Sequence, residues 1–226
     1  FMKTVDQSIE LAKLMVSIGT HHGRHVAAMI TDMDTPLGHN IGNSLEVMES
    51  MDVLKGKGPA DLTELVLTLG SYMVVMGGKA ANPAEGRQLL EQTIADGTAL
   101  DRFRAMVVAQ GGDPRVIDDY TVMPQAQYKI PYRAKRAGVL SRLAADEVGM
   151  ASMLLGGGRQ QADDQLDYSV GIELHHKLGD RVEAGEPLLT IYSNQEEVPA
   201  VEKLLDESIE ISDHYDQPKL IHEIIE

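Results

Sequence analysis

The first 110 residues contain one segment that is typical of a buried strand, and helical patterns surround it on both sides. This segment is the short apolar run at residues 25–30, while the flanking hydrophobic residues recur every three to four positions, as in about five helices. A single strand cannot form a sheet, because its backbone N–H and C=O groups need a neighbouring strand. The pattern therefore predicts that its partners lie upstream or on another chain, and that this sequence is a portion of a longer protein.

Capping residues and glycines set the predicted helix boundaries. Thr4, with Gln7 three residues later, forms a capping box that opens the first helix, and Gly19 is predicted to end it. The same signals predict further helices over residues 43–54, from 59 to the glycines at 77–78, from 83 onward after a capping asparagine, and over 98–110.

The sequence character changes after residue 112. Residues 113–127 contain two prolines and little periodicity, so we interpret them as a linker. Short strands with glycine turns follow at residues 128–132, 138–144, 168–175 and 188–193, with a short helix at 145–155 and a final helix at 198–209, capped by Asn194. Residues 170–191 resemble the hairpins of biotinyl and lipoyl carrier domains. No Met-Lys-Met motif follows them, so we expect a barrel-sandwich shape without a carrier role.

Composition excludes several classes of function. The net charge of −15 repels phosphate backbones, so nucleic-acid binding is not expected. No apolar run reaches the roughly 18 residues of a membrane span, and nothing resembles a signal peptide. Cysteine is absent, which removes disulfides, thiolate metal ligands and thiol nucleophiles. Cytoplasmic location is the simplest interpretation.

The run Asp32–Glu49 carries the densest polar chemistry of the chain. An apolar stretch leads into a Pro-Leu-Gly turn, and a helix opens after Gly42. Hard cations take oxygen ligands, often loop carbonyls with a carboxylate, and here the carbonyls of Leu37 and Asn40 and the carboxylate of Glu49 are candidates. The alternative is a helix N-terminus with acidic residues that favour its dipole. The residues alone leave both interpretations open.

Other groups of polar residues are weaker candidates for a functional site. His21, His22 and His25 are interrupted by glycines and are expected in a solvated loop. The segment Gly156–Arg159 lacks the Gly-Lys-Ser/Thr of a phosphate-binding P-loop. No Ser-His-Asp arrangement is indicated, and no catalytic residue is predicted in this chain.

Several blocks together closely resemble pyrimidine nucleoside phosphorylases, of which thymidine phosphorylases are relatives. The blocks are Asp32–Glu49, Gly58–Leu65 with Leu69-Gly70, Ala109–Asp113, and Gly156–Gly171. The resemblance extends over essentially the whole chain. It implies an α/β fold: residues 1–112 as the last, mostly helical part of a mixed α/β phosphorylase domain, 113–127 as the linker, and 128–226 as an α+β barrel-sandwich-like C-terminal domain.

The resemblance also implies a function. Such enzymes are pentosyltransferases that use phosphate as co-substrate and convert a pyrimidine nucleoside into free base and pentose 1-phosphate. The family's phosphate loop and its main base-binding residues precede residue 1, so the chain is expected to be inactive without the missing N-terminal half of the same protein. A non-catalytic binding or scaffold module with this fold is the alternative. A phosphoribosyltransferase relative is disfavoured by the barrel-like region.

Two binding sites follow from the same resemblance. A structural potassium or calcium ion would take Leu37, Asn40 and Glu49 as ligands, with further ligands from the missing half. Phe1 matches a family phenylalanine near the base pocket. No organic cofactor, nucleic acid or membrane partner is expected, and the intact protein is expected to be a homodimer.

Overall fold

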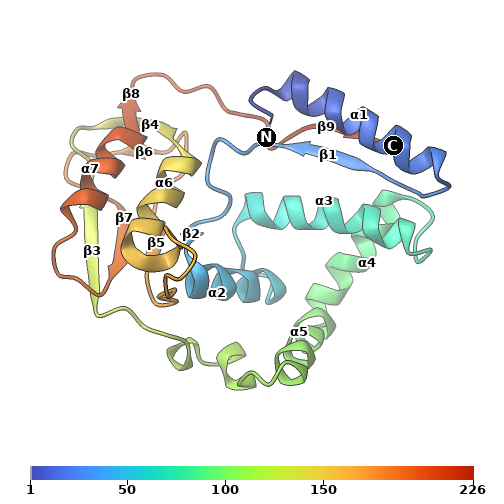
Figure 1. Ribbon diagram of the computed structural model, residues 1–226, viewed down its shortest axis with the longest axis horizontal. Coiled ribbons are helices and arrows are strands. Elements are labelled where there is room, and N and C mark those ends of the chain that lie inside the picture. Colours follow the sequence, from blue (N-terminus) through green and yellow to red (C-terminus); the bar gives the residue numbers. More distant parts are fainter. Residues whose placement is uncertain (1) are drawn as a thin grey trace. The chain divides into compact units, whose positions relative to one another are not determined.

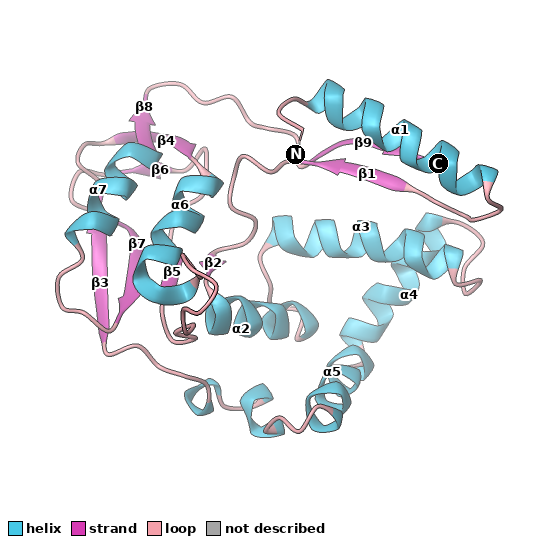
Figure 2. Cartoon of the chain, viewed as in Figure 1, coloured by secondary structure: helices cyan, strands magenta, loops and turns pink. Residues whose placement is uncertain are grey.

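The computed structural model describes residues 2–226, and Phe1, predicted near the base pocket, lies outside the described residues (Figures 1 and 2). The chain forms two compact units, each built from segments far apart in the sequence. Unit 1 contains residues 2–33, Ala60–Asp96 and Pro218–Glu226, and unit 2 contains Asp34–Pro59 and Gly97–Gln217. Within the described residues, no helix is both long enough and apolar enough to cross a membrane.

Unit 1 combines three helices with a two-stranded ladder. Its elements are α1 (Val5–His21), β1 (Ala28–Thr31), α3 (Ala60–Met76), α4 (Pro83–Ala95) and β9 (Ile221–Ile225). As predicted, Thr4 caps α1, where its hydroxyl accepts a hydrogen bond from the Gln7 N–H. Helix α1 packs along β1 and β9, and α3 packs against α4 (Figure 1).

The partner of the first strand lies downstream in the same chain. Strand β1 pairs antiparallel with β9, with Ala28 opposite Ile225 and Met29 opposite Ile224. The prediction that β1 needs an upstream or external partner is therefore wrong for this edge of the strand. The isoleucines of β9 lie in an acidic tail, whose charge concealed a segment with strong strand propensity.

The end of α1 also differs from the prediction. The helix continues through Gly19 to His21, and Gly23, with φ of 70°, adopts the left-handed conformation that commonly ends a helix. Gly19 has a packing role instead, because a Cβ there would lie 2.4 Å from the Val26 Cγ2 atom. The missing side chain lets the segment before β1 approach α1.

Unit 2 contains two antiparallel sheets with helices packed against them. Its elements are β2 (Asn40–Ile41), α2 (Asn43–Leu54), α5 (Thr98–Ala109), the 3₁₀ turns η1 (Pro114–Ile117) and η2 (Tyr120–Val122), β3 (Tyr128–Arg133), β4 (Gly138–Leu143), α6 (Ala145–Ser152), the π-helical turn η3 (Met153–Gly157), β5 (Gly171–Leu174), β6 (Arg181–Val182), β7 (Pro187–Ser193), α7 (Pro199–Ser208) and β8 (Ile209–Ser212). The strand orders are β2-β5-β7-β3 and β6-β4-β8.

The main core lies in unit 2, between the β5 and β7 strands and the helices α6 and α7. Ile172, Ile191, Val148 and Leu205 are fully buried in it. Alternation of buried and partly exposed residues along β7 shows that one face of this sheet packs on the core. The expectation of a mixed α/β fold with a strand-rich second half is confirmed.

Two local predictions in this unit need correction. The predicted linker is structured, because residues 113–127 contain η1 and η2, and the Ile117 side chain is fully buried. Asn194 does not cap the last helix; its side-chain amide donates to Asp167 and Ser169 instead. The division into domains at residues 113–127 stays a prediction, and the compact units separate the chain at other positions.

Candidate functional site

The polar run Asp32–Glu49 does form a strand, a loop and a helix, and the loop is attached to β5. The Leu174 N–H donates to the His39 carbonyl at 2.7 Å, and the His39 ring Nδ1 lies 3.0 Å from the Leu174 carbonyl oxygen. Strand β2 then pairs with β5, with Asn40 opposite Glu173. These contacts hold the loop against the most buried strand pair of unit 2.

The Glu49 carboxylate forms the centre of the site. It lies in the second turn of α2, is only 5% exposed, and turns back toward the loop. Its Oε1 accepts from the His39 N–H at 2.8 Å and from the Asn40 Nδ2 at 3.2 Å, and its Oε2 accepts from the Asn40 N–H at 3.4 Å. Burial raises the pKa of Glu49, and the hydrogen bonds from His39 and Asn40 partly oppose this increase.

Gly38 makes room for this carboxylate. A Cβ at Gly38 would lie 2.2 Å from the Glu49 Oε2, and the residue has a φ of 68°, which side chains other than glycine rarely adopt. The glycine of the Pro-Leu-Gly turn is therefore required twice, by the backbone conformation and by the approach of Glu49.

A lysine from the β5–β6 connection holds the other side of the loop. The Lys177 Nζ donates to the Pro36 carbonyl and to the Gly38 carbonyl, both at 2.5 Å. The ammonium thus binds the two carbonyls that flank Leu37. Such charge-assisted hydrogen bonds are about twice as strong as neutral ones, so Lys177 fixes the loop that carries the predicted ion ligands.

We predict that Lys177→Met lowers the free energy of unfolding by about 1–3 kcal/mol, because the two part-buried carbonyls lose a charged donor. Urea unfolding followed by circular dichroism measures this change. The control is Lys57→Met at an exposed position of the same unit, for which we expect a change within about 0.5 kcal/mol. Equal effects of the two variants would contradict the role given to Lys177.

A pocket of about 460 Å³ opens beside this loop. Its lining residues are His39, Asn40, Glu49, Asp52, Lys57, Gly58, Pro59, Glu173, Leu174 and His175. Two of its carboxylates have hydroxyl partners: Asp52 accepts from the Tyr120 hydroxyl at 2.5 Å, and Glu173 accepts from the Tyr192 hydroxyl at 2.6 Å. With three carboxylates in its lining, the pocket suits a cation better than a phosphate.

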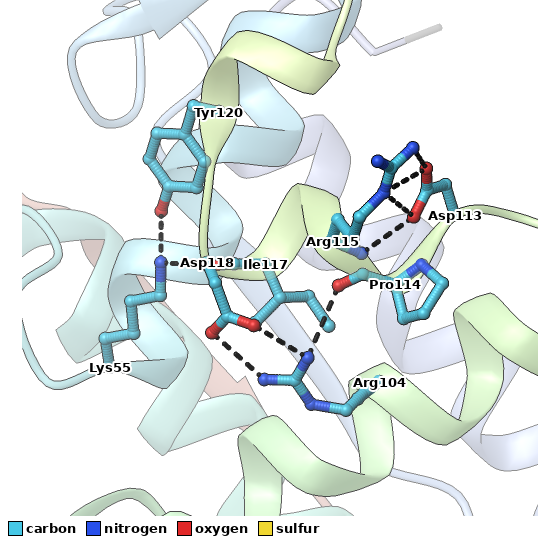
Figure 3. A network of polar contacts seen from close by, with 8 residues as sticks. All are labelled: Lys55, Arg104, Asp113, Pro114, Arg115, Ile117, Asp118 and Tyr120. Carbon is cyan, nitrogen blue, oxygen red and sulfur yellow. Dashed lines mark hydrogen bonds and ion pairs between the residues drawn. The ribbon is translucent and has the colours of Figure 1, made fainter.

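Helix α2 is also fixed by the segment that follows α5 (Figure 3). The Lys55 Nζ donates to the Ile117 carbonyl at 2.6 Å and to the Tyr120 hydroxyl at 2.9 Å. Arg104 on α5 forms a two-pronged ion pair with Asp118, with N–O distances of 3.0 and 3.1 Å. Residues 113–122 therefore anchor the helix that presents Glu49.

The structure brings two of the three predicted ligand residues into direct contact. Glu49 touches Asn40, and Leu37 lies between the two residues whose carbonyls bind Lys177. Among the side chains of residues 2–226, no group of three or more His, Cys, Asp or Glu residues is placed to hold a metal ion. An ion at this loop would therefore need backbone carbonyls, as the ligand set of Leu37, Asn40 and Glu49 proposes, and that set stays a prediction.

Sequence reasoning did not identify Lys177 or the amide groups around Glu49. The Gly179-Asp180 turn marked a hairpin near Lys177, but a lysine 139 residues from Gly38 gives no local signal of that contact.

The comparisons with known proteins decide the family. Residues 1–100 match the model of the glycosyl transferase family a/b domain, and residues 139–212 match the model of the pyrimidine nucleoside phosphorylase C-terminal domain. Both matches support the pyrimidine-nucleoside phosphorylase family. The family resemblance drawn from the four sequence blocks is therefore confirmed.

Relatives in this family are named pyrimidine-nucleoside phosphorylase and come from Staphylococcus aureus. Those of strains USA300, NCTC 8325 / PS 47 and bovine RF122 / ET3-1 are each 52% identical over 225 residues, which is 100% of this chain and 52% of the relative. The chain thus spans about half the length of the curated relatives it matches. The polar run Asp32–Glu49 lies within residues 1–100, and β5 to β8 lie within the C-terminal domain match.

Proposed function

We propose that this chain is part of a pyrimidine-nucleoside phosphorylase, a pentosyltransferase that transfers the pentose of a pyrimidine nucleoside to phosphate. The products are the free base and pentose 1-phosphate. The single observation that supports this proposal is the 52% identity, over the full chain, to relatives of that name. The same identity gives the proposal its substrates, phosphate and a pyrimidine nucleoside.

The chain alone is proposed to be inactive. The glycine-rich segment at Gly156–Gly158 is followed by Arg-Gln, not by the Lys-Ser/Thr of a phosphate-binding loop, and its Gly157 carbonyl accepts a hydrogen bond from the Asn43 side chain. The Glu49 site is rich in carboxylates and is poorly suited to phosphate. Binding of phosphate and base is therefore assigned to the part of the relatives that this chain does not match.

Phosphate-dependent cleavage of uridine and thymidine tests the function. The chain is assayed alone and as a chimaera, in which the unmatched part of the Staphylococcus aureus relative precedes residues 2–226. We expect cleavage by the chimaera and none by the chain alone. Cleavage by the chain alone would overturn the assignment of the catalytic residues. An inactive chimaera that folds would favour the alternative, a binding or scaffold module with the phosphorylase fold.

A structural potassium or calcium ion at the Glu49 loop is part of the proposal. A carboxylate has about four lone-pair positions, two on each oxygen. Oε1 accepts two N–H donors and Oε2 accepts one, so Oε2 retains capacity for a cation. With Leu37 and Asn40 contributing carbonyls, the ion would stiffen the turn between β1 and α2.

Thermal unfolding of the chimaera tests the ion site. We expect a higher midpoint in potassium or calcium chloride than in choline chloride at equal ionic strength, because an ion that binds only the folded state stabilises it. Glu49→Gln should remove this difference, since it replaces the charged ligand by a neutral amide. A midpoint that does not depend on the cation would contradict the site.

The proposal extends to assembly and location. The complete enzyme is proposed to be a homodimer that works in the cytoplasm. The absence of cysteine is compatible with a reducing compartment, and the dimer follows from the family resemblance.

A further inference from the structure

One stretch of this acidic chain is purely basic. Residues 120–145 contain no aspartate or glutamate, although the whole chain has 35 of these residues and a net charge of −15. The same stretch holds five of the chain's 20 lysines and arginines, namely Lys129, Arg133, Lys135, Arg136 and Arg142. Such a local excess of positive charge attracts anionic partners, which come either from the fold itself or from outside it.

Four of these five cations have partners inside the fold. Three form ion pairs with acidic side chains of unit 2, and the pairs are Lys135–Asp206, Arg136–Asp213 and Arg142–Glu147. The Lys129 ammonium lies 4.9 Å from the centre of the Tyr192 ring, within the range of a cation–π contact. These four side chains are therefore explained by contacts within unit 2.

Arg133 differs from the other four, because no acidic side chain binds it. Within the described part of the chain, its guanidinium donates only to the Gly185 carbonyl, from Nη1 at 2.8 Å. The Nε and Nη2 groups remain, and together they form the edge of a guanidinium that binds a carboxylate through two parallel hydrogen bonds. Arg133 can therefore bind an external carboxylate and keep its contact with the protein.

A pocket of about 160 Å³ lies beside Arg133 in unit 2. Its apolar lining comes from Leu188, Ile209 and Ile211, which pack in a second, smaller core cluster of this unit. Pockets for drug-sized molecules have volumes of about 300–1,000 Å³. The pocket beside Arg133 is smaller, so it suits a molecule with a single ring or a short branched chain.

The charges around this pocket favour an anion. Its lining includes Arg133, Lys135 and Arg136, and Asp206 is the single acidic residue among the lining residues. The Asp206 Oδ1 lies 2.5 Å from the Lys135 Nζ and accepts from the Tyr132 hydroxyl at 2.6 Å. Lys135 and Tyr132 together hold the pKa of Asp206 below its ordinary value. The acidic group is thus already bound, and the lining keeps an excess of positive charge.

We propose that this pocket binds a small carboxylate with an apolar body. The Nε–Nη2 edge of Arg133 binds the carboxylate, and Leu188, Ile209 and Ile211 contact the ring or branched chain. Inorganic phosphate is a poor ligand for this pocket, because it has no apolar part and would be desolvated against these three side chains. The site lies within unit 2 and does not depend on phosphorolysis.

A titration of the full chain with benzoate, followed by methyl NMR, tests the proposal. The methyl signals of Ile209 and Ile211 should shift along a saturable curve. Benzyl alcohol keeps the ring without the charge, and acetate keeps the charge without the ring. Each should bind at least about tenfold more weakly than benzoate, because each loses one of the two kinds of contact.

Substitutions at Arg133 separate its hydrogen bonds from its charge. Arg133→Gln should weaken benzoate binding at least about tenfold, and Arg133→Lys should have a smaller effect, because it keeps the charge but loses the two-donor edge. Arg181→Gln is the matched control. Arg181 is exposed on β6 in the same unit and does not line the pocket, so its loss removes one positive charge elsewhere. This variant should bind benzoate like the unchanged chain.

Three results would overturn the proposal. They are the absence of saturable shifts with benzoate, equal weakening by Arg133→Gln and Arg181→Gln, and displacement of benzoate by inorganic phosphate at equal concentration. The first would show that the pocket is not a binding site, and the other two would show that it responds only to charge. An inactive chimaera in the uridine assay would contradict the proposed function and leave this site unaffected.

Discussion

Glu49→Ala is expected to lower the free energy of unfolding of unit 2 by about 2–4 kcal/mol. The carboxylate accepts from the His39 N–H and from both the N–H and the Nδ2 of Asn40, and these donors lie in a part-buried loop. Each buried donor that loses its only partner costs roughly 1–3 kcal/mol, less where water can enter the space left behind. Urea unfolding of the chain, followed by far-ultraviolet circular dichroism, measures the change.

The control for this variant is Glu46→Ala, one turn earlier on the same helix. Glu46 is exposed and accepts one hydrogen bond, from the Gly42 N–H at 3.0 Å. Its loss should cost about 0.5–1 kcal/mol, as for other caps of helix N-termini. If Glu46→Ala destabilised the chain as much as Glu49→Ala, then Glu49 would act as a helix-capping acid and not as the centre of the loop.

Gly171→Ala is expected to destabilise unit 2 strongly. A Cβ at this position would lie 2.4 Å from the Ile41 carbonyl oxygen and 2.8 Å from the Leu45 Cδ1. A backbone carbonyl in the β2–β5 pair cannot move without breaking the ladder that holds the Glu49 loop. We expect a loss of about 3 kcal/mol in the free energy of unfolding, at the upper end of overpacking effects.

Gly149→Ala provides the matched comparison. Gly149 lies inside α6, and a Cβ there would have no atom within 4 Å. Alanine favours helix over glycine, so this variant should gain about 0.5–1 kcal/mol. Differential scanning calorimetry of both variants gives the two signs directly. A Gly171→Ala variant with an unchanged unfolding midpoint would show that β2 can separate from β5 without cost.

Local signals in the sequence were sufficient for most helices. The helix at residues 43–54 was predicted with the observed bounds, and the hydroxyl of Thr4 accepts from the Gln7 N–H as expected. These features depend on residues three to four positions apart, and their energetics are largely independent of the rest of the fold. The strands predicted at 128–132 and 188–193 form as β3 and β7, each one residue longer than predicted, because Gly and Pro turns limit them.

Features that depend on distant residues were missed. The pairing of β1 with β9 joins the two ends of the chain, and the acidic residues around β9 suggested a solvated tail. Lys177, in the connection between β5 and β6, donates to the Pro36 and Gly38 carbonyls. No periodicity in the sequence indicates such a contact. The sequence therefore indicated Asn40 and Glu49, which lie in contact, but not the groups that hold them, and their role as ion ligands stays a prediction.

The β1–β9 ladder has a consequence for the synthesis of the protein on the ribosome. Ala28 pairs with Ile225, so β1 is translated long before its partner exists. At typical elongation rates of about 5–20 residues per second, this delay is roughly 10–40 s. During that interval the edge of β1 that will pair with β9 is unpaired. A nascent chain in this state is a natural substrate for chaperones that shield strand edges. A chain truncated before residue 221 would lack β9, and this temporary state would become permanent.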